Sequence, residues 1–554
     1  MNEVRLKCLN NNKLIIVPKG TTLLEAAKLF DVNLPNPIVG ALANNCIREC
    51  SFEFYHPQTI KFIDVTDVDG MRIYTRSLFF VLYAAVKELY PEAKLRIEHS
   101  VSKGYFCELT NFDKELDIQT VFQIGKKMKE IIEADIPFIH IKDETENVIE
   151  VFDKCGFTDK KELIEHRGQY YTSYYKMGKH VGLFYGYLAA STGVLKVFDL
   201  NKYFKGMLLQ VPKRSNPEEV AELILQKKMF EIFREHNQWN KILNVSNISD
   251  LNRQILKGDA EVLIQVSEAL QEKKIAQIAD QIATLKDMLK IVLISGPSSS
   301  GKTTFGKRLA TQLIVSGIIP INISLDNYFV NRELTPLDEN GEYDFEALDA
   351  IDLKLFNDQM VQLLEGNEIE IPTFSFENGE RFYDGTKLKM EPGNILIIEG
   401  IHGLNPKLTE AINPDAKYKI YISALTSINI DDLTRIPTTD NRLLRRILRD
   451  YKYRGYSAQN TIARWESVRR GEDLHIFPYQ EEADVMFNTA LLYEFAVLKP
   501  FVEPILLEVQ PNQPEFSEAT RLLKFLSYFK PIISNNIPPT SILREFLGGS
   551  SFKY

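Results

Sequence analysis

The sequence predicts an α/β protein whose C-terminal half is built on a doubly wound, mostly parallel sheet. Three observations support this fold class. Short apolar runs, typical of parallel strands buried on both faces, lie at residues 291–294, 319–324, 395–398 and 418–422. Helical patterns alternate with these runs, an arrangement that places ligands at the carboxyl ends of the strands. The first run leads directly into a glycine-rich loop.

This loop reads Gly296-Pro297-Ser298-Ser299-Ser300-Gly301-Lys302-Thr303-Thr304 and fits G-x-x-x-x-G-K-[ST]. Backbone N–H groups converge on phosphate oxygens only where the chain curls tightly, which glycine permits. The helix expected from Lys302 offers its N-terminal N–H groups to the same anion. Lys302 is expected to reach the β- and γ-phosphates, and Thr303 to hold Mg²⁺. We therefore expect an α/β P-loop NTPase fold that binds ATP through residues 296–304.

Length and composition narrow the class of protein. A chain of 554 residues is too long for one core and implies several domains. Its net charge of −9 argues against a general nucleic-acid coat, although a local basic patch is still open. Five cysteines, all in the first third, fit a reducing cytoplasm. The sequence shows neither a signal core nor an apolar run long enough to span a membrane. We expect a cytoplasmic protein.

Three carboxylates are candidates for chemistry. Asp326 follows the strand at 319–324 and is suited to accept a proton from a substrate hydroxyl. Glu399 ends an apolar strand, as a Walker-B acid that holds Mg²⁺ does. Asp344 is a weaker candidate for hydrogen bonds to sugar hydroxyls. The alternative is a helix-cap or turn aspartate for Asp326, an acid that only caps the strand for Glu399, and a solvated loop acid for Asp344.

A basic stretch at residues 435–470 carries nine Arg and one Lys against three acids, a local charge of +7. Four of its arginines follow i, i+3, i+4, i+7 spacing and share one helical face: Arg442, Arg445, Arg446 and Arg449. We expect a helical lid that closes positive charge over a migrating phosphoryl group. A solvated basic face and an RNA-binding patch are the alternatives.

The motifs together resemble the uridine kinase and phosphoribulokinase family across nearly all of 290–500. They are the loop, then Asp326-Asn327-Tyr328-Phe329, then residues 399–405 from Glu399, then residues 440–450 with the arginines. The resemblance implies that Asp326 is the base, Glu399 the metal acid, and Tyr328, Asp344, Arg381 and Arg442 substrate-side residues. It also implies catalytic roles for Lys302, Arg442, Arg446 and Arg449.

Two departures from the family lie near the nucleobase. Phe374-Ser375-Phe376 stands where uridine kinases carry Tyr-Asp-Phe, and Gly379 stands at the position of the following histidine. The resemblance therefore does not carry over uracil or cytosine specificity. The loop, metal and base residues are retained, so phosphoryl transfer is still expected.

The front of the chain resembles the N-terminal part of threonyl-tRNA synthetases. Residues 1–65 resemble the β-grasp TGS domain, through Thr22-Leu23-Leu24-Glu25-Ala26-Ala27 and the stretch 38–45. The first four of these residues also form a capping box. Residues 66–214 resemble the second additional domain, an α+β editing module, through the stretches 77–95 and 191–198.

The editing chemistry of that family is not expected in this chain. Its HxxxH and CxxxH pairs, which remove wrongly attached amino acids from tRNA, fall on Arg76, Phe80, Phe184 and Leu188. These side chains cannot form the required metal and proton-transfer site. The module is expected to be a scaffold that binds RNA or another partner, or that orders a homo-oligomer.

The remaining segments complete the expected layout. Residues 215–289 predict a helical bridge, with a coiled-coil dimerisation helix as the alternative. Residues 290–535 form the kinase-like domain. The tail, 536–554, is apolar enough that we expect it to pack on a neighbouring domain or subunit. The whole layout resembles the bacterial uridine kinase-like nucleoside kinases.

The sequence therefore predicts an ATP:nucleoside 5′-phosphotransferase that uses Mg²⁺ and acts on a nucleoside such as uridine or cytidine. One alternative is a kinase for a sugar phosphate or another small alcohol. Another is an RNA-binding regulatory ATPase. A catalytically silent interaction protein is disfavoured, because the loop, metal and base residues are all present.

Overall fold

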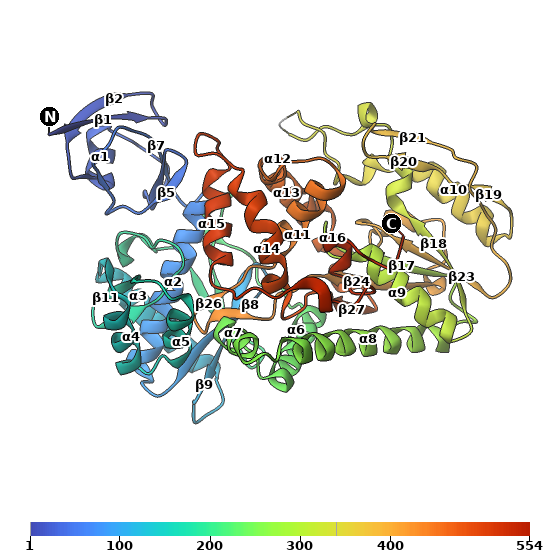
Figure 1. Ribbon diagram of the computed structural model, residues 1–554, viewed down its shortest axis with the longest axis horizontal. Coiled ribbons are helices and arrows are strands. Elements are labelled where there is room, and N and C mark those ends of the chain that lie inside the picture. The colour runs from blue at the N-terminus through green and yellow to red at the C-terminus, as the bar shows by residue number, and fades with distance from the viewer. Residues whose placement is uncertain (1, 340, 554) are drawn as a thin grey trace.

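The computed structural model describes residues 2–339 and 341–553. The N-terminal sheet and the sheet of the C-terminal half lie at opposite ends of the long axis, with a group of helices between them (Figure 1). None of the helices in the described ranges is both long and apolar enough to cross a lipid bilayer.

The N-terminal domain is a mixed five-stranded sheet with one helix. The sheet has the order β2-β1-β7-β4-β5, in which β1 and β7 run parallel. Its elements are β1 (Glu3–Cys8), β2 (Leu14–Pro18), α1 (Leu23–Leu29), β4 (Gly40–Ala43), β5 (Cys46–Arg48) and β7 (Gln58–Ile63). The expected capping box is present, since Thr22 N donates to Glu25 Oε2 at 2.8 Å and Glu25 N donates back to Thr22 Oγ1. The assignment as a TGS domain stays a prediction.

The next module contains two antiparallel sheets and four helices. One sheet has the order β13-β14-β9-β8 and the other β10-β11-β12. The strands are β8 (Lys94–Val101), β9 (Gly104–Thr110), β10 (Phe138–Glu144), β11 (Tyr171–Met177), β12 (His180–Gly182), β13 (Asp199–Tyr203) and β14 (Gly206–Gln210). The helices are α2 (Val68–Leu89), α3 (Ile118–Glu133), α4 (Thr145–Lys154) and α5 (Thr158–Arg167).

The bridge differs from the wholly helical segment predicted for 215–289. It opens with a strand, β16 (Asn216–Val220), paired with β15 (Pro212–Lys213). Three helices follow: α6 (Lys227–Leu243), α7 (Ile248–Lys257) and α8 (Ala260–Thr284). The buried residues Ile275 and Ile282 of α8 belong to the same apolar cluster as Phe305 of the next domain. The bridge is therefore packed into the C-terminal half rather than held apart from it.

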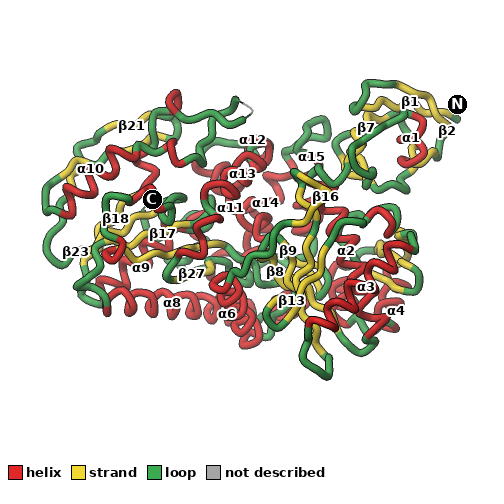
Figure 2. The backbone as a smooth tube through the Cα atoms, turned by 180° about the vertical axis from the view of Figure 1, so that it is seen from behind, coloured by secondary structure: helices red, strands yellow, loops and turns green. Residues whose placement is uncertain are grey.

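The C-terminal sheet is parallel throughout and has the order β18-β23-β17-β24-β27. Its strands are β17 (Ile291–Ser295), β18 (Ile319–Ser324), β23 (Asn394–Glu399), β24 (Lys417–Ser423) and β27 (Val485–Asn488). Successive side chains of a strand point to opposite faces. Val292 accordingly packs in the cluster that contains α8 and α9 (Lys302–Val315), whereas Leu293 packs with α10 (Leu353–Leu364). Helices cover both faces of this sheet, as Figure 2 shows from behind.

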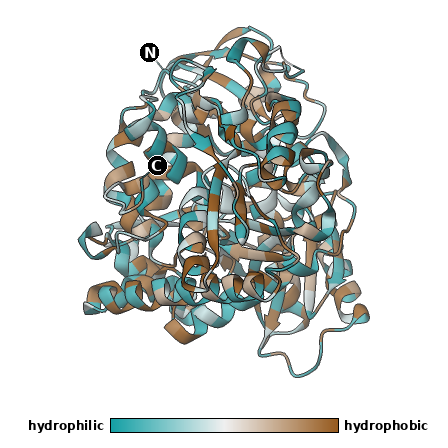
Figure 3. Ribbon diagram, turned by 90° about the vertical axis from the view of Figure 1, so that its right-hand side faces the viewer, coloured by the Kyte–Doolittle hydropathy of each residue, from teal (hydrophilic) through white to brown (hydrophobic). Residues whose placement is uncertain are grey.

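The chain then forms a helical group beside the sheet. It consists of α11 (Thr438–Tyr453), α12 (Ala458–Ala463), α13 (Trp465–His475), α14 (Glu494–Leu507), α15 (Phe516–Leu526) and α16 (Arg544–Leu547). In Figure 3 many helix ribbons alternate between brown and teal along their length, as amphipathic helices on a core do. At α15 this group contacts the synthetase-like module, where Glu518 accepts hydrogen bonds from Arg72 at 2.6 Å and 3.1 Å.

Candidate active site

The glycine-rich loop connects β17 to α9, as the sequence predicted. Gly301 lies at φ +86°, a conformation that side chains with a Cβ rarely adopt. A Cβ on Gly296 would stand 2.1 Å from the carbonyl oxygen of Ile422, so only glycine fits there. These two positions let the loop curl back over the N-terminus of α9, the end of a helix that attracts anions.

Lys302 lies within the curl of the loop. Its Nζ donates to the carbonyl oxygens of Gly296 at 2.9 Å and Pro297 at 3.1 Å. Burial lowers the pKa of Lys302, while the carboxylates of Glu399 and Asp326 act in the opposite direction. The lysine is therefore held inside the loop with two acids close to it.

Glu399 is the centre of a group of oxygen donors at the carboxyl edge of the sheet. Its Oε1 accepts from Ser324 Oγ at 2.9 Å and from Thr303 Oγ1 at 3.3 Å. Burial, followed by the charge of Asp326, raises the pKa of Glu399 to about 7. A carboxylate with neighbouring hydroxyls is the hard oxygen set that Mg²⁺ prefers, so these residues fit that ion.

Asp326 lies on the same edge of the sheet as the loop. It follows β18 in the short helix η2 (Leu325–Tyr328), and Ser324 of β18 is directly opposite Glu399 of β23 in the strand register. Its charge acts on both Lys302 and Glu399. The structure thus brings the predicted base, lysine and metal acid together, because their three strands are neighbours and parallel.

Tyr328 is not where the resemblance placed it. Its side chain is fully buried, and its hydroxyl donates to Gln359 Oε1 at 2.8 Å. Its ring packs edge-on against Phe356 of α10. The tyrosine therefore belongs to the core under the site, and its prediction as a substrate contact needs correction, because the turn after Asp326 directs the ring inward.

Asp344 lies in a loop and Arg381 on a short strand. Asp344 lines a small cavity of about 150 Å³ together with Arg470 and Leu474. Arg381 lies on β21 (Glu380–Phe382) opposite Phe374 of β20 (Thr373–Ser375), and its guanidinium pairs with Asp352 at 3.0 Å. Their substrate contacts stay predictions.

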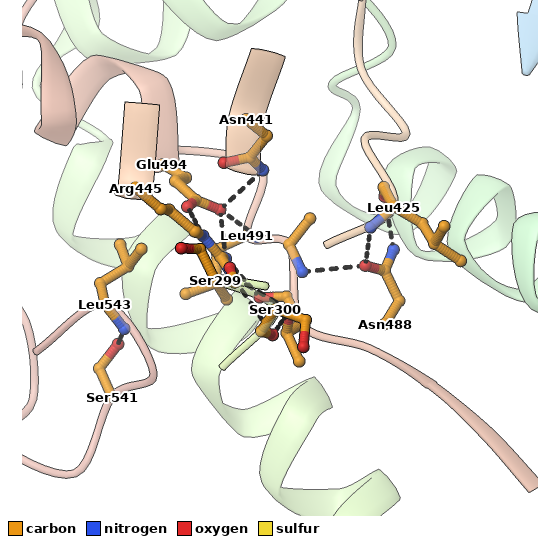
Figure 4. Close-up of polar contacts among 12 residues, drawn as sticks. Ser299, Ser300, Leu425, Asn441, Arg445, Asn488, Leu491, Glu494, Ser541 and Leu543 are labelled. Carbon is orange, nitrogen blue, oxygen red and sulfur yellow. Dashed lines mark hydrogen bonds and ion pairs between the residues drawn. The ribbon is translucent and has the colours of Figure 1, made fainter. Parts of the chain in front are cut away.

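Arg442 and Arg445 are held by buried carboxylates. Arg442 pairs with Glu472, with Nη2 to Oε2 at 2.8 Å, and only 1% of it is exposed. Arg445 is fully buried, pairs with Glu494 at 2.8 Å, and donates to the carbonyl oxygen of Thr489 at 3.0 Å. Figure 4 shows Arg445 between Glu494 and the serines of the loop. Both also donate to the loop backbone, Arg442 Nη1 to the carbonyl oxygen of Ser298 at 3.2 Å and Arg445 Nη1 to those of Ser299 and Ser300 at 3.5 Å.

Arg446 and Arg449 are less neutralised. Both pair with one carboxylate, Asp450, at 3.3 Å and 2.7 Å. Arg446 also donates to Ser298 Oγ of the loop at 2.9 Å. Burial, followed by the neighbouring Arg449, lowers the pKa of Arg446. Positive charge therefore remains in excess beside the loop at these two residues.

Helix α11, which carries the four arginines, does not have the form of the predicted lid. Its side chains Leu443, Leu444, Ile447 and Leu448 are fully buried. It packs against α14 and α16. Opening such a helix would expose this apolar face to water, so the structure makes it a fixed element of the core.

Sequence reasoning missed four glutamates at this site: Glu346, Glu472, Glu494 and Glu545. Ser298 N donates to Glu472 Oε1 at 3.2 Å, and Thr304 Oγ1 donates to Glu545 Oε2 at 2.6 Å. Burial would raise the pKa of Glu472, but Arg442 and Arg469 outweigh it and hold the pKa below its usual value. The surplus of arginines in the stretch 435–470 was the available signal, because buried cations require partners.

Comparisons with known proteins agree on the C-terminal half. The model of the family described as "Phosphoribulokinase / Uridine kinase family" matches residues 291–492. A uridine kinase of Lactobacillus helveticus is 30% identical over 197 residues, which cover 35% of this chain and 84% of that protein. A uridine kinase of Clostridium botulinum is 29% identical over 198 residues, 35% of this chain and 86% of that protein.

The N-terminal region is similar to a different group of proteins. A threonine–tRNA ligase of Desulforamulus reducens is 27% identical over 245 residues, 42% of this chain. The matched region spans only 38% of that ligase. The chain is thus similar to about two fifths of that ligase and not to its full length.

Among solved structures, a putative fructose transport system kinase from Silicibacter sp. TM1040 is 18% identical, with a TM-score of 0.30. The matched region covers 38% of this chain and 98% of that kinase. A possible uridine kinase from Bacillus stearothermophilus is 16% identical with a TM-score of 0.26, covering 38% of this chain and 100% of that one. Both scores are too low to support a structural argument.

Proposed function

The chain belongs to the phosphoribulokinase/uridine kinase family, and we propose that it transfers the terminal phosphoryl group of ATP to the 5′-hydroxyl of a nucleoside such as uridine or cytidine. One observation carries the proposal. The carboxyl ends of three neighbouring parallel strands bring Lys302, Asp326 and Glu399 to one edge of the sheet. A phosphate-binding loop, a base and a metal acid around one point suit phosphoryl transfer to an alcohol.

In this proposal Asp326 is the general base. Its carboxylate accepts the proton of the substrate hydroxyl while the hydroxyl oxygen attacks the terminal phosphorus in line, and ADP leaves. Asp326 is suited to this because β18 fixes the backbone just before it, and Ser324 Oγ accepts from Asp326 N at 3.4 Å. A base held on a strand end does not have to be ordered during the reaction.

Mg²⁺ would be held by Thr303 and Glu399, and it would neutralise charge on the β- and γ-phosphates. The pKa of Glu399, raised to about 7, fits a carboxyl group that binds a cation, because burial without a counter-ion favours its protonated form. Lys302 would exchange its two loop carbonyls for phosphate oxygens. Arg446 and Arg449 would supply further positive charge over the migrating group.

An aromatic cluster near the base favours a nucleoside over a small sugar phosphate. Phe329, three residues after Asp326, lies 5.6 Å from Phe374 and 6.4 Å from Phe376 between ring centroids. Phe376 is 42% exposed, and the guanidinium of Arg454 lies 4.6 Å from its ring centroid. Such a wall offers stacking to a planar base but few donors with which to read it.

The test is ADP release, measured with a panel of ribonucleosides and then with sugar phosphates. Nucleoside-dependent release that is lost in Lys302→Ala, and falls by about 10² or more in Asp326→Asn, supports the proposal. Release that depends only on a sugar phosphate would move the substrate class to the alternative. Near-normal turnover in Asp326→Asn would remove the base from the mechanism.

A second candidate is an RNA-dependent ATPase, favoured by the similarity of the N-terminal region to threonine–tRNA ligases. In that case the front modules would grip tRNA, and the C-terminal half would act as a switch. Adding tRNA to the same assay separates the two functions. ADP release that requires tRNA and no nucleoside would favour the switch.

A further inference from the structure

The C-terminal tail lies on the glycine-rich loop, which is a contact that nothing in its sequence indicates. After α15 the chain runs back along α14, where Ile532 N donates to the carbonyl oxygen of Ala496 at 2.9 Å. It then buries Ser541, Ile542, Leu543 and Phe546 completely. The end of the tail, at α16, is anchored to α11 because Lys452 Nζ donates to the carbonyl oxygen of Leu547 at 2.7 Å.

The tail covers one side of the loop. The Cγ2 atom of Ile542 would stand 2.7 Å from a Cβ placed on Gly301, so it packs directly on that glycine. The ring of Phe546 lies 5.1 Å from the guanidinium of Arg445, the arginine that donates to the loop carbonyl oxygens of Ser299 and Ser300. Any ligand that enters from this side meets the tail first.

Glu545 is the tail residue that reaches the anion-binding end of α9. Its Oε2 accepts from Thr304 Oγ1 at 2.6 Å and from Thr304 N at 3.3 Å. Thr304 is the third residue of α9 and so belongs to the first turn, whose N–H groups point out of the helix end. The helix offers that N–H, with its partial positive charge, to an anion. A carboxylate provides the same kind of oxygen acceptor and the same sign of charge as a phosphate.

We propose that Glu545 is an intramolecular competitor of the nucleotide. With the tail docked, its carboxylate occupies the acceptor position at Thr304 that a phosphate of ATP needs, and ATP binds only when Glu545 has left it. This inference rests on the proposed function, because it requires that the loop bind ATP. Two anions cannot share the position, since they would lie within hydrogen-bond distance of the same N–H and repel each other.

The local geometry suits a movable contact. Helix α16 is only four residues long, and Gly548 and Gly549 follow it at φ +83° and +71°. Ile542 and Leu543 are buried before this short helix and Phe546 and Leu547 are buried within it, whereas Glu545 is only half-buried. Glu545 is therefore withdrawn either by a rotation of its own side chain or by a shift of α16 that also loosens these buried residues.

The test is the dissociation constant for Mg²⁺-ATP in the full-length protein and in two variants, Glu545→Gln and Glu545→Ala. If the docked state holds about nine tenths of the molecules, the apparent affinity rises about tenfold when it is removed. Glu508→Gln is the matched control, because Glu508 is exposed and its carboxylate accepts from the hydroxyl of Tyr451 at 2.8 Å. An unchanged or weaker affinity in both Glu545 variants would overturn the proposal.

Hydrogen exchange on the unmodified protein gives a second measurement that needs no substitution. Faster exchange of the amides at 544–548 on adding Mg²⁺-ATP supports displacement of the tail. Slower exchange there would make the tail a fixed wall of the nucleotide site and would overturn the proposal. If neither the wild-type protein nor any variant binds Mg²⁺-ATP, the proposed function itself fails. If all bind equally, only the competition fails.

Discussion

The kinase-like half and the synthetase-like module differ in the side chains that they place where the families they resemble carry out chemistry. At the sheet edge of the C-terminal half, three charged side chains lie near one another: Lys302, Asp326 and Glu399. In the synthetase-like module, the aligned editing positions are packed: Phe80 is fully buried, and its ring lies 5.4 Å from that of Phe184. The C-terminal half thus places charged side chains at one edge of its sheet, whereas three of the four aligned editing positions in the front module hold apolar side chains.

Arg76 shows the same difference in a charged residue. Its guanidinium lies 5.6 Å from the ring of Tyr185 and against the backbone of Gly186, and its Nε donates to the carbonyl oxygen of Arg72. Burial lowers the pKa of Arg76. Arg76 is held by a ring and a carbonyl oxygen and therefore serves packing. Arg446, in contrast, lies beside the glycine-rich loop and donates to the hydroxyl of Ser298.

The largest expected effect comes from the kinase-like half. Asp326→Asn should lower kcat by about 10²–10⁴, because the amide cannot accept the proton of the substrate hydroxyl. Steady-state ADP release measures it. Asp349→Asn, an exposed aspartate in the short helix η4 (Leu348–Ala350), is the control and should leave kcat unchanged. A variant that keeps more than a tenth of the wild-type kcat would show that Asp326 is not the base. The contrast between a catalytic C-terminal half and a packed front module would then lose its support.

The next effect concerns stability at the boundary of the site. Arg445→Met should lower the free energy of unfolding by about 3–5 kcal/mol, because Glu494 would be left buried without its partner. Urea denaturation measures it. The double variant Arg445→Met/Glu494→Leu should recover most of the loss, since it removes both charges. If the double variant is no more stable than the single one, the loss of the Arg445–Glu494 ion pair does not explain the lower free energy of unfolding.

A packing change in the synthetase-like module should act on stability alone. Phe80→Ala should cost about 3 kcal/mol through the cavity it leaves among the rings of Phe138, Phe184 and Tyr83. Thermal unfolding and kcat at a temperature where the variant is folded measure the two quantities. We expect kcat to be unchanged. A loss of kcat in a stably folded variant would mean that the front module contributes to catalysis.

The smallest expected effect is a pH dependence at Glu346. Burial raises the pKa of this carboxyl from 4.5 to about 7 in the folded protein, with Arg446 and Lys302 opposing the shift and Glu472 and Asp344 adding to it. The folded state therefore holds the proton more tightly, so its stability falls as the pH rises from about 4.5 to about 7.

Glu346→Gln removes this titration. The variant should have a higher Tm than the wild type at pH 8 and nearly the same Tm at pH 5, as measured by calorimetry. A difference that is larger at pH 5 than at pH 8 would reverse the sign and place the ionised carboxylate in a favourable environment.

Much of the site could be predicted because its signals are local. The glycine-rich loop lies within nine consecutive residues, and Asp326 and Glu399 each follow a recognisable apolar strand. The prediction of a lid was wrong for a reason that spacing cannot reveal. A helical face of four arginines looks the same whether it meets phosphate or buried glutamate, and here Arg442 and Arg445 meet glutamate.

The sequence by itself determined the parallel sheet, the loop and the order of the residues around it, because each depends on a short stretch of chain and on the period of its side chains. Only the tertiary structure decided which acids neutralise the arginines, that Tyr328 points into the core, and that Glu545 rests on Thr304. Thr304 and Glu545 are 241 residues apart in the chain. Contacts of that kind are set by how whole elements pack, and no local spacing encodes them.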